Sequence, residues 1–225
     1  MRTLLLFRGA PGSGKSTLTK LLLRFDDVKD GAIKIDGQDV RDVTQESLRG
    51  AIAYVPQESS LFHRSIFENI AYARPDASLE EVIAAAKLAN AHSFIELLPD
   101  GYNTVLKNNG SNLSQGQRQL LSIARAAVAD PPVMILDEAT AMLDPKGRRE
   151  VMDVVLRLNK EEKITVIVIT HFPEEALLAD RAIVMSQGKI VMEGKPQEVL
   201  SKGEELKKYS LTLPAPTRVC RELTG

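Results

Sequence analysis

The stretch that decides the fold is Gly9-Ala10-Pro11-Gly12-Ser13-Gly14-Lys15-Ser16-Thr17. It matches the phosphate-binding loop (P-loop) pattern of a glycine, four further residues and then Gly-Lys-Ser. The apolar residues 3–7 before it predict a buried parallel strand. Leu18, Leu21, Leu22 and Phe25 recur behind it at helical spacing. A strand, a glycine-rich turn and a helix N-terminus form an anion site, because backbone N–H groups and the helix dipole face the phosphates. A chance glycine-rich turn is the alternative, but it leaves the flanking strand and helix unexplained.

Individual residues of this loop have predicted roles. Lys15 is expected to reach the β- and γ-phosphates of a bound nucleotide, and the Ser16 hydroxyl is expected to ligate Mg²⁺. All of residues 9–17 are predicted to contact the nucleotide.

The composition is that of a globular protein. The chain has 225 residues, with 44% hydrophobic and 26% charged, which suits one large domain or a core with an inserted subdomain. A formal net charge of −1 gives no electrostatic case for nucleic acid, so we expect no nucleic-acid partner. No run approaches the roughly 20 apolar residues of a membrane span. The lone Cys220 excludes an internal disulfide.

Three further apolar runs end in polar residues and predict a parallel sheet. The runs are 52–55, 133–136 and 164–170, and the polar residues that follow them are Gln57, Asp137, Glu138 and His171. Parallel strands gather their chemistry at their carboxyl ends, so we expect these residues beside the P-loop. The predicted fold is α/β, with a mainly parallel sheet flanked by helices and an inserted helical subdomain.

The polar residues at the strand ends suggest metal and proton chemistry. Asp137 is the expected Mg²⁺ ligand, directly or through water. Glu138 is then left to polarise an attacking water as general base, or else it is a helix N-cap acid. His171 could donate to the γ-phosphate, although a histidine at a strand end is more often structural. Gln57, just past a core strand, is expected to reach and bind the nucleotide, although taken alone it is only a polar loop residue.

The remaining pattern divides the chain into four parts. Residues 32–36 alternate as a half-exposed strand, and Ser78 with Glu81 forms a capping box that opens a helix. Pro145 begins a helix to about Leu158. Residues 182–185 and 189–192 predict a hairpin, and residues 196–200 a short helix. We assign 1–62 to the first part of the core, 63–129 to the helical subdomain, 130–202 to the second part of the core and 203–225 to a tail.

One further motif carries a family resemblance. Leu113-Ser114-Gln115-Gly116-Gln117 resembles the signature motif of ATP-binding-cassette (ABC) ATPases, whose usual form is Leu-Ser-Gly-Gly-Gln. The P-loop, Gln57, Asp137-Glu138, Leu143-Asp144 and His171 follow the order of that family. The resemblance covers nearly the whole chain and implies the P-loop NTPase fold, with ATP and Mg²⁺ as ligands.

The resemblance also implies partners and roles. Two ATPase domains, identical or different, would pair head to tail, and the signature residues of one would close on the ATP held by the other. The signature residues are Ser114, Gln115, Gly116 and Gln117, with Asp144 at the dimer seam. Lys15, Glu138 and His171 would be catalytic, and Ser16, Gln57 and Asp137 would serve the metal. Gln57 would couple the nucleotide to transmembrane subunits, with the domain in the cytoplasm at the inner face of the membrane.

Two departures from the family pattern, and a mixed resemblance along the chain, suggest alternatives. Gln115 stands where glycine is usual, which is tolerable if its side chain points away. No β segment with an adenine-stacking aromatic precedes residue 3, and the missing aromatic predicts weaker ATP binding. The chain also looks composite: residues 1–17 resemble P-loop kinases, 32–144 exporter-type ABC domains, and 145 onward energy-coupling-factor importer ATPases. An engineered chimera, or a truncated P-loop protein with little ATPase activity, is therefore one alternative, and a P-loop kinase is another.

Overall fold

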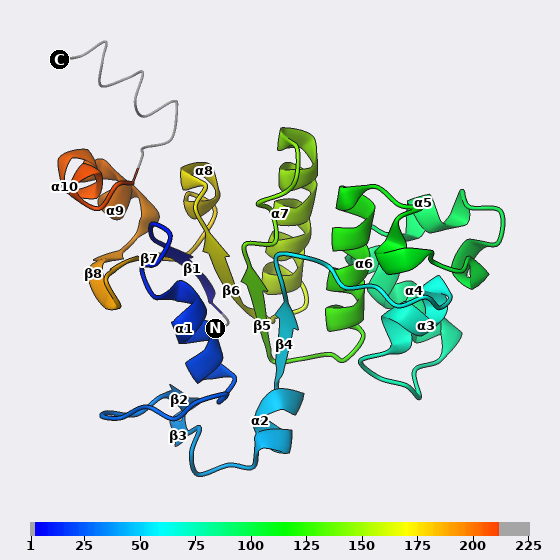
Figure 1. Cartoon of the computed structure of the whole chain (residues 1–225), viewed down its shortest axis with the longest axis horizontal. Coiled ribbons are helices and arrows are strands. Elements are labelled where there is room, and N and C mark those ends of the chain that lie inside the picture. The colour runs from blue at the N-terminus through cyan, green and yellow to red at the C-terminus, as the bar shows by residue number, and fades with distance from the viewer. Residues whose placement is uncertain (1–2, 212–225) are drawn as a thin grey trace. The chain divides into compact units, whose positions relative to one another are not determined.

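The computed structural model describes residues 3–211 (Figure 1). Within that range the chain forms two compact units, residues 3–49 with 167–211 and residues 50–166. The first unit contains β1 (Leu4–Arg8), α1 (Lys15–Leu22), β2 (Lys34–Ile35), β3 (Gln38–Asp39), α8 (Pro173–Ala176), β7 (Arg181–Ser186), β8 (Lys189–Gly194), α9 (Pro196–Ser201) and α10 (Gly203–Lys208). The second contains β4 (Ile52–Val55), α3 (Ile66–Ala71), α4 (Leu79–Leu88), α5 (His92–Glu96), η1 (Gly101–Asn103), η2 (Asn108–Gly110), α6 (Gln115–Ala127), β5 (Val133–Asp137) and α7 (Pro145–Lys160). The boundaries fall at the end of α2 (Gln45–Gly50) and inside β6 (Thr165–Thr170).

The strands form the predicted sheet. Six of them follow the order β4-β5-β6-β1-β7-β8. β4 pairs in parallel with β5, and β1 with β7, whereas β7 and β8 form the predicted antiparallel hairpin. Helices flank this sheet (Figure 1), so the α/β class with a mainly parallel sheet is confirmed.

Two local predictions in the first unit need correction. The strand expected at 32–36 is shorter in the structure: only Lys34 and Ile35 form β2, which pairs with β3 in a two-stranded sheet. Asp36 and Gly37 have φ of 49° and 83°, which turns the chain back after two residues as a tight hairpin requires. Phe25 does not extend the apolar face of α1. That helix ends at Leu22, Arg24 turns to a φ of 51°, and Phe25 is 64% exposed with Arg49 over its ring.

The second unit holds the helices that the sequence predicts between residues 65 and 129. α3 and α4 each begin with a complete capping box, at Ser65 and at Ser78. α6 is buried along Leu121, Ile123 and Ala124 and packs against α3 and α4 (Figure 1). That residues 63–129 form a separate subdomain stays a prediction. The predicted tail from residue 203 begins with α10, and its residues beyond 211 lie outside the described part.

Candidate nucleotide-binding site

The P-loop of the first unit wraps around the amine of Lys15. Lys15 Nζ donates to the Gly9 carbonyl at 2.7 Å and to the Ala10 carbonyl at 3.2 Å, and its side chain is buried. The loop is closed by Ser13 N–H, which donates to the Ala10 carbonyl at 3.1 Å. The Ser13 carbonyl in turn accepts from Gly188 N–H at 2.9 Å, which ties the loop to the turn between β7 and β8. The positively charged amine of Lys15 is thus surrounded by the backbone of the P-loop.

The glycines of this loop are required by its geometry. A Cβ on Gly9 would lie 2.3 Å from Ser13 Oγ and 2.6 Å from the Met185 carbonyl oxygen. Gly14, the N-cap of α1, has a φ of 101°, a backbone conformation that residues other than glycine rarely adopt. The first turn of α1 contains no acidic residue, and Ser16 and Thr17 on it are exposed. A helix N-terminus without carboxylates, beside a buried lysine, fits phosphate groups.

The carboxylates at the end of β5 lie in the second unit. Asp137 closes β5 and is half-buried, and its Oδ2 accepts from the Tyr54 hydroxyl at 3.0 Å. Burial, and then the neighbouring Asp137 charge, raises the pKa of Tyr54. Glu138 is half-buried and has a φ of 51°. The alternative of Glu138 as a helix N-cap is wrong, because α7 begins at Pro145 and its cap is Asp144.

Gln57 is exposed, but the residues that follow it in sequence are hydrogen-bonded to α6. Ser59 Oγ donates to Gln119 Oε1 at 2.5 Å, and Arg125 donates to the Ser60 carbonyl at 2.7 Å. Both Ser59 and Gln119 are buried. These contacts could not be predicted from the sequence, because polar residues on an amphipathic helix are normally assigned to its solvent-exposed face. The chain that follows Gln57 therefore belongs structurally to the helix that begins at the signature motif.

The signature residues form the N-terminus of α6. Ser114 caps the helix: its Oγ accepts from Gln117 N–H at 3.2 Å, and Gln117 Oε1 accepts from Ser114 N–H at 2.9 Å. The side chain of Gln115 turns to Arg118, which donates to its Oε1 at 2.6 Å. Leaving out its chain neighbours and the backbone of its own helix, no atom lies within 4 Å of a Cβ built on Gly116. The glutamine that replaces the usual glycine has its side-chain oxygen bonded to Arg118 of the same helix.

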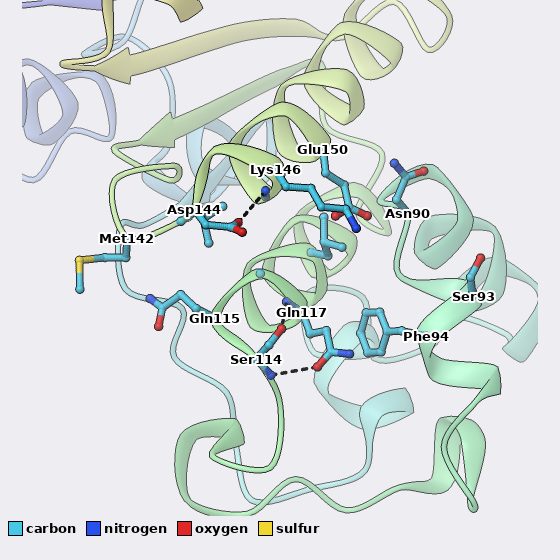
Figure 2. A pocket seen from close by; sticks show the side chains of 14 residues that line it. Asn90, Ser93, Phe94, Ser114, Gln115, Gln117, Met142, Asp144, Lys146 and Glu150 are labelled. Atoms are coloured by element: carbon cyan, nitrogen blue, oxygen red, sulfur yellow. Dashed lines mark hydrogen bonds between the residues drawn. The ribbon is translucent and has the colours of Figure 1, made fainter.

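A hollow of about 590 Å³ joins the signature residues to the start of α7 (Figure 2). Asp144 lines it and caps α7 by accepting from Gly147 N–H at 2.8 Å. Figure 2 shows Phe94 and Gln117 pointing toward each other, with Lys146 and Glu150 reaching in from α7. Phe94 was not a predicted site residue, because its apolar neighbours in sequence mark it only as part of a helix core. The structure thus brings Ser114–Gln117 and Asp144 together around one space within the second unit.

The other predicted residues divide between the two units. His171 follows β6 in the first unit, where it is exposed and its ring lies 4.2 Å from that of Phe172. Gln57, Asp137 and Glu138 belong to the second unit. Within residues 3–211 there is no cluster of three or more His, Cys, Asp or Glu side chains able to hold a metal.

The comparisons with known proteins agree with this geometry. The family model described as "ABC transporter" matches residues 2–141. The chain belongs to the ABC transporter family. It is 48% identical, over 86% of its length, to the uncharacterized ABC transporter ATP-binding protein YfiC of Bacillus subtilis. It is also 48% identical, over 85% of its length, to an ATP-dependent lipid A-core flippase of Desulfotalea psychrophila. The solved structure of a bacterial Atm1-family ABC exporter with ATP bound matches 89% of the chain at 40% identity, with a TM-score of 0.82.

This ABC domain spans about a third of its relatives: 32% of YfiC, 33% of the flippase and 35% of the exporter chain. Because one relative matches 86% of the chain, the comparisons give no support to a composite origin. Across the part that the structure describes, no helix is both long enough and apolar enough to cross a membrane.

Proposed function

We propose that this ABC domain binds ATP and hydrolyses it with Mg²⁺. The observation that carries the proposal is the glycine-rich loop closed around the buried Lys15 amine, 2.7 Å from the Gly9 carbonyl. Such a ring offers backbone donors and one positive charge to a triphosphate. When phosphate enters, the Lys15 amine exchanges loop carbonyls for phosphate oxygens, and its charge offsets the negative charge of the transferred group.

Magnesium would be held by oxygen donors of three side chains. We propose Ser16, Gln57 and Asp137 for this role, which uses the hydroxyl, amide and carboxylate oxygens that Mg²⁺ accepts. The bound ion would supply charge neutralisation on the phosphates. The phosphates of the nucleotide would complete its coordination.

The remaining chemistry is assigned to two side chains. Glu138 directly follows Asp137 and is half-buried, and we propose that it accepts a proton from a water that attacks the γ-phosphate. His171 follows β6 and is exposed, so it can donate a hydrogen bond to the γ-phosphate. We assign the main catalytic effect to positioning and charge stabilisation, as in other phosphoryl transfers.

A second ATPase domain is proposed to complete the site. Ser114 Oγ accepts one hydrogen bond from Gln117 and keeps its own proton to donate, and the Gly116 amide lies in the first turn of the helix, where N–H groups have no intrahelical acceptor. Both groups stand at the N-terminus of a thirteen-residue helix, which favours an anion. We propose that the ATP of a head-to-tail partner would bind in the hollow beside them. Transport would follow from coupling through Gln57 to transmembrane parts, and the domain would work at the cytoplasmic face of the membrane.

The test replaces the proposed base. Glu138→Gln removes the proton acceptor but keeps the shape, so we expect ATP turnover to fall by about 100-fold or more while ATP binding persists. Glu162→Gln, an exposed residue of the same unit beyond α7, is the matched control and should keep full turnover. Phosphate release gives the rate, and light scattering with MgATP reports dimerisation. Equal turnover of Glu138→Gln and the parent chain would refute the base assignment.

A further inference from the structure

The hydroxyl of Tyr54 is an unassigned group next to the proposed metal ligand. Tyr54 lies on β4, where it is paired with Ile135 of β5, and Asp137 stands two residues further along that strand. The hydroxyl donates to Asp137 Oδ2 at 3.0 Å. The contact joins residues 83 positions apart in sequence, so the register of two parallel strands creates it.

Packing alone does not account for this tyrosine. Its side chain is 40% exposed, so water could satisfy its hydroxyl. A phenylalanine would bury the same ring against the sheet without the oxygen. The hydroxyl instead meets a carboxylate, and hydrogen bonds to an ionised acceptor are roughly twice as strong as those between neutral groups.

We propose that Tyr54 is a positioning residue that fixes the Asp137 carboxylate for Mg²⁺. The inference rests on the proposed function, since it assumes that Asp137 serves the metal. A carboxylate rotates about its last bond unless a neighbour holds one oxygen. With Oδ2 held at 3.0 Å by Tyr54, the plane of the carboxylate is set before nucleotide and metal arrive. Partners of this kind, one step removed from the metal, change its affinity by about 10 to 100-fold when they are removed.

The experiment removes one oxygen atom. Tyr54→Phe is compared with the parent chain in a Mn²⁺ titration at saturating ATP, with free Mn²⁺ followed by electron paramagnetic resonance. We expect the Mn²⁺ concentration at half-saturation to rise by about 10-fold. Binding of ATP in EDTA, which needs no metal, should stay unchanged. The matched control is Tyr102→Phe, which removes the hydroxyl that lies 2.9 Å from His92 Nδ1 in the same unit and should leave the titration unaltered.

Each outcome decides the question. An unchanged Mn²⁺ half-saturation in Tyr54→Phe overturns the inference. A loss of ATP binding in EDTA as large as the loss with metal also overturns it, because the effect is then structural. Circular dichroism of the variant checks that the fold is kept. If the parent chain itself binds no ATP, the proposed function fails. If the parent chain binds ATP and Tyr54→Phe gives the same Mn²⁺ titration, only the role of Tyr54 fails.

Discussion

Replacing Asn69 with alanine should destabilise the second unit more than any exposed polar substitution in it. Asn69 is 1% exposed and lies on α3. Its Oδ1 accepts from Phe62 N–H at 2.8 Å and from Arg125 Nη2 at 2.8 Å. Its Nδ2 donates to three carbonyls, those of Phe62, Arg64 and Ser65, at 3.0 to 3.2 Å.

The expected loss in the free energy of unfolding depends on which groups would be left without a hydrogen-bond partner. Each of the three carbonyls keeps another backbone donor: Arg64 N–H, Leu106 N–H and Asn69 N–H respectively, at 2.8 to 3.0 Å. Phe62 N–H would lose its side-chain acceptor, which costs about 1–3 kcal/mol. Arg125 would lose one hydrogen bond from a charged donor, worth about 1.5 kcal/mol, although it keeps those to Ser60 and to the Asn69 carbonyl. We therefore expect the free energy of unfolding to fall by about 3 kcal/mol.

Urea denaturation followed by far-ultraviolet circular dichroism measures this change. Asn103→Ala is the control, because Asn103 is exposed in η1 of the same unit, and it should shift the free energy of unfolding by no more than about 0.5 kcal/mol. A loss below about 1 kcal/mol in Asn69→Ala, close to that of the control, would refute the argument that this side chain anchors the segment after Gln57.

Two further predictions concern the first unit. Gly9→Ala should displace the P-loop, since its Cβ would lie 2.3 Å from Ser13 Oγ. We expect the free energy of unfolding to fall by about 2 kcal/mol and ATP binding, measured by calorimetry, to be lost. Gly50→Ala, whose Cβ would have no atom within 4 Å, is the control, and retained ATP affinity in Gly9→Ala would contradict the clash. Hydrogen bonds from Arg41 lower the pKa of Asp39 from 3.8 to about 2, so the Asp39 carboxylate stabilises the fold above pH 3.8 and that contribution is lost as the pH falls through about 2. Asp39→Asn should flatten the acid dependence of the urea midpoint in this range, and an unaltered pH profile would count against the pair.

The sequence predicted those features that depend on near neighbours. The β-branched run at 164–170 and the capping box at Ser78 each specify one local conformation, and both were found as β6 and α4. Pro145 began α7 as expected. The strand at 32–36 was overestimated, because alternation predicts an extended chain but says nothing of a turn at Asp36.

Contacts between distant segments could not be predicted in this way. The bonds of Tyr54 to Asp137, of Ser59 to Gln119 and of Asn69 to Arg125 join residues 83, 60 and 56 positions apart. Each contact depends on strand register or on how segments pack, and neither of these produces a periodic pattern in the sequence. The P-loop was predictable because its glycines, lysine and serine act within one short stretch.

The backbone of Glu138 has a consequence for any attempt to make this domain more robust. A residue with a side chain held at a φ of 51° adopts a conformation that costs about 1–2 kcal/mol, and glycine would relieve it. Thermostability screens should therefore favour glycine at this position, and the hardier protein that results would lack its carboxylate. On the proposed role of Glu138 as general base, selection for heat resistance alone would recover molecules that have lost ATP turnover.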